Sequence, residues 1–142
     1  MDRIDWQAPS ANELALMQSP AIARRILVID LEATCEDGDS LAPEDMEIIE
    51  IGAVWATTQG SVINTFQAFV RPVLCQQLSA FCRQLTGIEQ ANVDGAQLFP
   101  TIAAALTSFA QRYQAPDAIW GSWGQFDATQ FARDCRRHTR ER

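Results

Sequence analysis

The chain has 142 residues, enough for one domain with a substantial hydrophobic core. Hydrophobic residues make up 47% and charged residues 20% of it, which is typical of a globular protein and excludes a disordered one. The net charge of -7 argues against a protein that coats nucleic acid through bulk positive charge, but it allows contact with a phosphate chain through bound divalent cations.

Residues 1–24 are expected to form an extension that precedes the domain. They begin MDRIDWQAPS, with acids where a signal peptide carries positive charge, and no apolar segment follows. Asn12 is placed to cap a short helix that runs to Met17, before Pro20. No apolar run approaches the ~20 residues of a membrane span. We therefore expect a cytoplasmic protein with no membrane partner.

The first strand is predicted over Arg25–Asp30, where the aliphatic run is continuous enough for burial on both faces. It leads into Asp30 and Glu32, whose side chains point to the same side because side chains alternate along a strand. Two adjacent carboxylates in apolar surroundings repel each other unless a cation lies between them. Carboxylates without His or Cys suit Mg²⁺ or Mn²⁺. The two acids therefore either hold such a cation or lie solvated at an exposed strand end.

A polar loop and two further strands follow the first strand. The acids of the loop do not form a calcium-binding loop, because Glu44 stands where that loop requires glycine. Both strands are rich in β-branched residues, and a Gln-Gly turn joins them into a hairpin. The predicted segments are the loop at 36–45, the strand Met46–Thr58, the turn at 59–60 and the strand Ser61–Pro72.

The rest of the chain predicts three helices around one short strand. The first helix lies around Leu78–Leu85, and the longest covers Phe99–Tyr113, where apolar residues recur at spacings of three and four. A fourth strand is predicted at Ala118–Trp120, and Trp123 in the loop after it is interpreted as a packing residue. Asp127 opens the last helix. Three strands in a meander, followed by helices around a strand, predict a layered α/β domain.

Five blocks of the sequence resemble the DEDD-type 3′-to-5′ exonucleases. They are ILVIDLEATC, EIIEIGAV, FQAFVRP, LSAFCRQLTGI and GSWGQFD, and they keep the order and approximate spacing of the family over about residues 25–137. The resemblance is to the branch that includes the histone-mRNA 3′ exonuclease and small bacterial relatives. It implies an α/β, ribonuclease H-like fold with a mixed sheet and flanking helices. In that sheet, strands one to three are antiparallel and strand four is parallel to strand one.

The resemblance also implies a site and a reaction. Asp30, Glu32 and Asp127 match the catalytic carboxylates that hold two divalent ions, Mg²⁺ or Mn²⁺. Two such ions can activate a water and stabilise the charge that develops at phosphorus. The implied substrate is a single-stranded 3′ end, RNA more than DNA, from which 5′-mononucleotides are released. The residues matching the nucleotide pocket are Ala33 and Thr34 beside the terminal ribose, Phe81 stacking on the terminal base, Leu85 and Thr86 lining the pocket, and Phe126 at a position that is often aromatic.

The third motif of the family, a histidine followed five residues later by an aspartate, has no match before Arg142. The single histidine, His138, lies eleven residues after Asp127 on one predicted helix, ~16 Å along its axis, which is too far to share a metal site. The exonuclease domain over residues 25–142 is therefore expected to be C-terminally truncated, without its last strand and helix. A truncated or frameshifted gene product, an engineered fragment and a pseudoenzyme all stay open.

Two functions follow from this pattern. The first is a metal-dependent 3′-to-5′ exonuclease; the second is a noncatalytic nucleic-acid-binding or protein-interaction module on the same fold. The retained acids and Phe81 favour an intact substrate site, whereas the missing third motif favours lost or severely reduced turnover. Without a fifth strand, Ala118–Trp120 would form an open sheet edge, so we expect a homo-oligomer that pairs through this edge.

Overall fold

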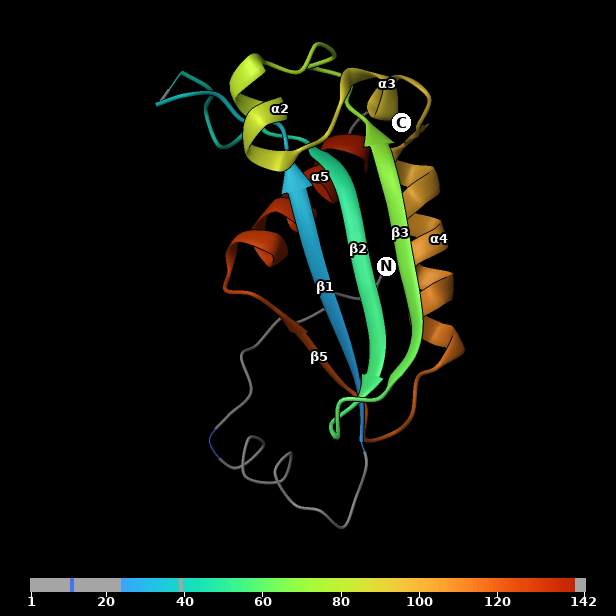
Figure 1. The fold of residues 1–142 in the computed structure, drawn as a ribbon. Coiled ribbons are helices and arrows are strands. Elements are labelled where there is room, and N and C mark those ends of the chain that lie inside the picture. The colour runs from blue at the N-terminus through green and yellow to red at the C-terminus, as the bar shows by residue number, and fades with distance from the viewer. Residues whose placement is uncertain (1–10, 12–23, 39, 140–142) are drawn as a thin grey trace.

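The structure, a computed structural model, describes residues 11, 24–38 and 40–139; the helix predicted from Asn12 lies outside them. These residues form a mixed sheet with the strand order β4-β3-β2-β1-β5 (Figure 1). None of the described helices is both long and apolar enough to cross a membrane. The strands are β1 (Arg25–Ala33), β2 (Ile48–Thr57), β3 (Val62–Arg71), β4 (Gln97–Leu98) and β5 (Ile119–Ser122). The helices are α2 (Ala80–Thr86), α3 (Gln90–Asp94), α4 (Phe99–Arg112) and α5 (Phe126–Thr139).

The predicted strand topology is confirmed. Strands β1, β2 and β3 form an antiparallel meander, and β5 pairs with β1 in parallel, with Ile119 opposite Ile26. The turn between β2 and β3 contains Gly60 at a φ of 90°, a left-handed conformation that suits glycine. Strand β4 was not predicted, because Gln97–Leu98 is too short to show a periodic pattern. It pairs in parallel with the end of β3 and leads directly into α4.

Helices α4 and α5 cover one face of the sheet, and in Figure 1 they lie behind the strands. The main core packs the buried side chains of β1 and β2 against both helices. Trp55 of β2 anchors α4 by donating its indole N–H to the carbonyl of Phe109 at 3.1 Å. Phe99 of α4 meets Phe131 of α5 edge to face, with ring centroids 5.5 Å apart.

Burial of β1 on both faces was predicted wrongly. Its alternate residues Leu27, Ile29 and Leu31 are buried, whereas Val28 is 42% exposed and Asp30 is exposed. The reason is that, within the described residues, both long helices pack on the same side of the sheet. Side chains on the other side of β1 therefore face outward, and Asp30 and Glu32 are among them.

A second, smaller core lies where β2 and β3 meet the short helices α2 and α3, drawn at the upper end of the sheet in Figure 1. Its buried members are Ile49, Leu78, Cys82, Ile88 and Val93. Cys35, directly after β1, packs against this cluster. The small core therefore holds α2 beside the end of β1, which is where the sequence predicts the site.

Candidate active site

Asp30 and Glu32 lie near the end of β1, on the side of the sheet away from α4 and α5. In the β1–β2 ladder Asp30 is opposite Gly52 and Glu32 is opposite Glu50. Burial raises the pKa of Glu32 above its usual value, and the negative charges of Asp30, Glu50 and Asp127 raise it further. Asp30 and Glu32 are two positions apart in a regular part of the β1–β2 ladder, so their side chains lie on the same side of the strand, as predicted.

Asp127 reaches this group from the first turn of α5. The chain turns at Gly124, whose φ is 80°, and Ser122 donates its hydroxyl to the Gly124 carbonyl at 3.1 Å. The side chain of Asp127 is only 6% exposed, and its Oδ2 atom has no hydrogen-bond partner among the described residues. Burial, with a smaller contribution from the charge of Asp30, raises the pKa of Asp127 to about 6.

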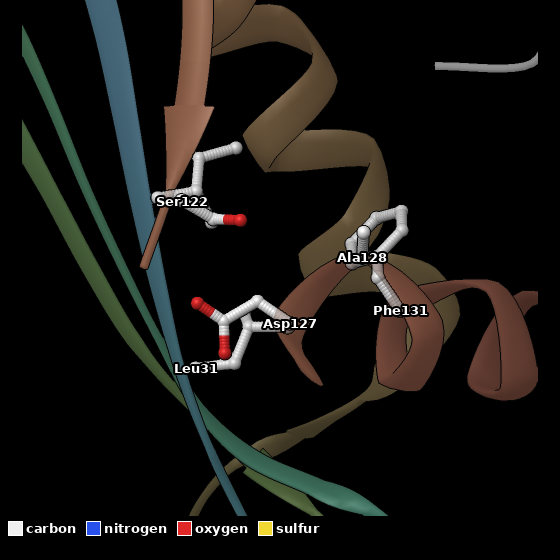
Figure 2. A pocket seen from close by; sticks show the side chains of 6 residues that line it. Leu31, Ser122, Asp127, Ala128 and Phe131 are labelled. Atoms are coloured by element: carbon white, nitrogen blue, oxygen red, sulfur yellow. The ribbon is translucent and has the colours of Figure 1, made fainter. Parts of the chain in front are cut away.

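A small recess surrounds the Asp127 carboxylate, between α5 and β1. In Figure 2 this carboxylate points toward β1, beside Leu31. Apart from Asp127 and Ser122 the lining is apolar, so little in it compensates a negative charge. The residues that line the recess are Ile29, Leu31, Ser122, Asp127, Ala128 and Phe131.

The chemistry of these oxygens fits a hard divalent cation. Asp127 offers a buried carboxylate oxygen without a donor, and its charge and those of Asp30 and Glu32 destabilise one another. A cation between them would remove both costs. In the described part of the chain, however, no three acidic, histidine or cysteine side chains are gathered into a preformed metal site. The assignment of these three acids as ligands therefore stays a prediction.

Helix α2 presents an apolar surface next to the end of β1. Ser79 caps the helix by accepting from the backbone N–H of Cys82, and it also donates its hydroxyl to the carbonyl of Cys35. Phe81 and Leu85, four positions apart on one side of α2, are 36% and 67% exposed. An exposed aromatic ring beside a leucine is suited to stacking under a base.

The other residues predicted for the nucleotide pocket differ in their surroundings. Ala33 and Thr34 are buried at the end of β1, and the Thr34 hydroxyl accepts the backbone N–H of Glu47. The hydroxyl of Thr86 closes the end of α2 by donating to the carbonyl of Cys82 at 2.8 Å. Phe126 is 46% exposed at the start of α5. Whether these residues contact a nucleotide stays a prediction.

The structure agrees with the interpretation of His138 but not with that of Trp123. His138 lies at the far end of α5 from Asp127, and its ring stacks on Phe99 at 5.4 Å between centroids, consistent with its predicted absence from the metal site. The interpretation of Trp123 as a packing residue is wrong, because its side chain is 93% exposed. It lies in the loop that turns at Gly124, beyond the end of β5 and outside the core.

Two buried polar groups near the site were missed by sequence analysis. Glu47, 2% exposed, accepts three backbone N–H groups just before β2. Asp134, 1% exposed, accepts from Gln130, from Arg137 and from the backbone of Ile48. Asp127, Gln130, Asp134 and Arg137 follow one another at spacings of three and four on α5. This periodic polar stripe could have indicated that Asp134 is a buried, hydrogen-bonded acid. For Glu47 the sequence shows only an acid directly before an apolar strand.

The exonuclease family model (RNase_T) matches residues 27–140. The chain belongs to this exonuclease family. Human 3′-5′ exoribonuclease 1 is 49% identical over 106 residues, which are 69% of this chain and 30% of that protein. The 3′-5′ exonuclease eri1 of Schizosaccharomyces pombe is 37% identical over 91 residues, 63% of this chain and 30% of the relative. The expected branch of the family is confirmed.

Solved structures give the same assignment. The nuclease domain of 3′hExo, a DEDDh family member bound to rAMP, superposes with a TM-score of 0.75 at 30% identity, over 85% of this chain and 62% of that one. The 3′-exonuclease that recognises the 3′ end of the histone mRNA stem-loop has a TM-score of 0.75 at 31% identity, over 89% of this chain and 46% of that one. The ribonuclease H-like fold is therefore confirmed, and the chain spans only part of its relatives. Exonucleases of this DEDDh family use divalent metal ions.

Proposed function

We propose that this chain forms part of a 3′-to-5′ exoribonuclease that removes 5′-mononucleotides from single-stranded 3′ ends by two-metal hydrolysis. The observation that carries the proposal is the Asp127 carboxylate: it points toward β1, its buried Oδ2 has no hydrogen-bond partner among the described residues, and its charge interacts with those of Asp30 and Glu32. The names of the relatives support RNA over DNA, since one is an exoribonuclease and another recognises an mRNA 3′ end.

In this proposal one set of residues binds the ions and another contacts the nucleotide. Asp30, Glu32 and Asp127 would hold two divalent ions, either Mg²⁺ or Mn²⁺. When bound, such ions activate a water and stabilise the charge on the phosphate. Phe81 and Leu85 provide an apolar surface on which any terminal base can stack, as an enzyme that shortens mixed sequences requires. Ala33 and Thr34 bring the end of β1 next to that surface.

One observation favours the noncatalytic alternative for these 142 residues. Their single histidine, His138, is stacked on Phe99 and lies at the opposite end of α5 from Asp127. It is therefore not placed to take the proton of an attacking water. General-base catalysis is typically worth ~10²–10⁴-fold in rate. We therefore propose that the 142-residue chain binds a 3′ end but releases nucleotides at least about two orders of magnitude more slowly than a relative with the third motif.

The test separates binding from cleavage. A fluorescent single-stranded RNA and the matching DNA are titrated with the chain in Mn²⁺, and anisotropy reports affinity while gel electrophoresis reports nucleotide release. We expect measurable RNA affinity that Asp127→Asn weakens, together with slow release. Glu44→Gln is the matched control, because it neutralises an exposed acid outside the site. Absence of RNA affinity would contradict the proposal, and release at the rate of a complete relative would contradict the noncatalytic part.

We also propose that the chain self-associates through a sheet edge. Strand β5 is the last strand of the described sheet, and its four residues Ile119–Ser122 are all half-buried. The last strand of a sheet can pair with a strand from a second chain.

A further inference from the structure

Glu47 occupies an unusual position for an acid. Its side chain is buried directly before β2, and each carboxylate oxygen accepts from the backbone of the segment after β3. Oε1 accepts from Val73 at 2.7 Å, and Oε2 accepts from Leu74 and Cys75 at 2.8 Å each. Among the described residues, the ion pairs found do not involve Glu47. Three charge-assisted bonds from consecutive amides therefore offset the cost of burying this carboxylate.

The backbone of Glu47 is joined to the end of β1. Thr34 donates its backbone N–H to the Glu47 carbonyl at 2.8 Å, and the Glu47 N–H donates to the Thr34 hydroxyl at 2.9 Å. Thr34 follows β1, two residues after Glu32. Glu47 thus joins two parts of the chain. Its backbone is hydrogen-bonded to Thr34 at the end of the strand that carries the acids, and its side chain holds segment 73–75.

That segment leads into the helix with the exposed aromatic ring. Between the end of β3 at Arg71 and the start of α2 at Ala80 there is no helix or strand, so the path of the chain depends on side-chain hydrogen bonds and on the burial of Leu78 in the small core. Gln90 accepts from the backbone of Leu78 at 2.8 Å, and Ser79 donates to the carbonyl of Cys35 at 3.0 Å. Glu47 fixes the start of the segment, and these two contacts fix its end.

We propose that Glu47 is a positioning residue for the terminal nucleotide. Its carboxylate holds segment 73–75 against the end of β1 and thereby sets the position of Phe81 on α2 relative to Asp30 and Glu32. This inference rests on the proposed function, because it assigns a role in the same nucleotide site. It requires the charge and both oxygens of Glu47, since the amide group of a glutamine would turn an N–H donor toward at least one backbone N–H.

The test measures nucleotide affinity and ion affinity separately. AMP is titrated in Mn²⁺ by calorimetry, and Mn²⁺ is titrated alone, at a temperature where circular dichroism shows each variant to be folded. Glu47→Gln should weaken AMP binding at least about tenfold and leave Mn²⁺ affinity within about twofold, because the acids on β1 and α5 are untouched. Glu44→Gln, the same change at an exposed position in the same loop, should leave both affinities unchanged.

Chemical rescue provides a second readout, one that a general loss of stability would not show. Glu47→Ala leaves the three amides without this acceptor and removes a CH2–COO⁻ group, which has the size of an acetate ion. Added acetate should then restore AMP affinity toward that of the unchanged chain, and it should have no effect on the unchanged chain or on Glu44→Gln. Restoration of AMP affinity by acetate would show that AMP binding depends on a carboxylate that accepts from these amides.

The outcomes separate the inference from the proposed function. A folded Glu47→Gln variant that binds AMP as tightly as the unchanged chain overturns the inference alone. Equal loss of AMP and Mn²⁺ affinity, absence of acetate rescue in folded Glu47→Ala, or failure of both variants to fold also overturns it, because Glu47 would then serve the fold in general. If the unchanged chain binds no AMP, the proposed function fails and the inference fails with it.

Discussion

Each of the three acids at the site lies in a different environment. Asp30 is exposed, Glu32 is half-buried, and Asp127 is only 6% exposed with one oxygen that lacks a donor. Burial, with a further contribution from neighbouring negative charges, raises the pKa of both Glu32 and Asp127, so the charged forms are unfavourable in the ion-free site. A divalent cation held by the three acids would offset these costs. If all three acids are ligands, replacing any one of them should weaken ion binding.

Replacement of Asp30 by asparagine tests this dependence. Asp30→Asn keeps the size of the side chain and removes one charge, so Mn²⁺ affinity measured by calorimetry should fall at least about tenfold, since even groups that only contact a metal ligand are often worth ~10–100-fold. Asp37→Asn, at an exposed acid in the loop after β1, should leave the affinity unchanged. Equal Mn²⁺ affinity in Asp30→Asn and the unchanged chain would remove Asp30 from the site.

The exposed ring of Phe81 gives a second prediction at the same scale. Phe81→Ala should weaken binding of single-stranded RNA by ~1–3 kcal/mol, the usual value of stacking one base on an aromatic ring. The loss should be similar for oligonucleotides that end in A, U or C, because stacking uses the face of the base. Val62→Ala removes another exposed apolar side chain, 65% exposed on β3 and away from α2, and serves as the control in the anisotropy titration. An effect confined to one terminal base would indicate hydrogen-bonded recognition instead.

At the scale of the element, α5 is held to the rest of the domain by a polar stripe as well as by Phe131. Asp134 accepts from Arg137 at 2.6 Å and from the backbone N–H of Ile48 at 3.2 Å, and Arg137 donates to the Met46 carbonyl at 3.0 Å. Burial raises the pKa of Asp134, although Gln130, Arg137 and Ile48 oppose that effect. The stripe ties the last turns of α5 to the start of β2, and therefore fixes how Asp127 at the other end of α5 approaches β1.

Removing only Asp134 from the Asp134–Arg137 ion pair should destabilise the fold. Asp134→Ala leaves the mostly buried Arg137 guanidinium without its carboxylate and should lower the free energy of unfolding by ~3–5 kcal/mol. The double variant Asp134→Leu with Arg137→Leu removes both charges and should lose less than Asp134→Ala alone. Urea unfolding followed by circular dichroism measures both values. A double variant that is less stable than the single variant would show that the ion pair itself stabilises the fold.

At the scale of the whole molecule, the elements with local apolar patterns were predictable and the buried charges were not. The meander of β1–β3 follows from aliphatic and β-branched runs with a Gln-Gly turn between the second and third, and α4 and α5 follow from apolar spacings of three and four. The donors to Glu47 lie 26 to 28 residues away, and the Ile48 donor to Asp134 lies 86 residues away. No local pattern reports such partners. One-sided burial of β1 was missed for the same reason, because it depends on where two distant helices pack.

The described sheet ends in two strands that could pair with another chain, and the sequence pointed to only one of them. Strand β5 is the last strand at one end of the described sheet. At the other end, among the described residues, β4 pairs only with Val70 and Arg71, so most of β3 has no neighbouring strand on that side. Side chains near the start of β3 are exposed, with Val62 at 65%. Either edge could accept a strand from a second chain, so association has to be assigned to one of them.

Sedimentation velocity at micromolar concentration can show which edge is used. Two variants are compared, and each places one lysine at one of the two edges. We expect a dimer or larger species that forms through β5, because the residues of this strand are half-buried and Ile119 lies beside the apolar side chain of Ile26. Ile119→Lys should therefore shift the chain toward monomer, since a charged side chain on an edge strand opposes pairing with another chain. Val62→Lys places the same charge on β3 and should leave the assembly intact. Loss of association in Val62→Lys alone would assign the interface to β3, and a monomeric unchanged chain with cooperative unfolding would show that neither edge recruits a second copy.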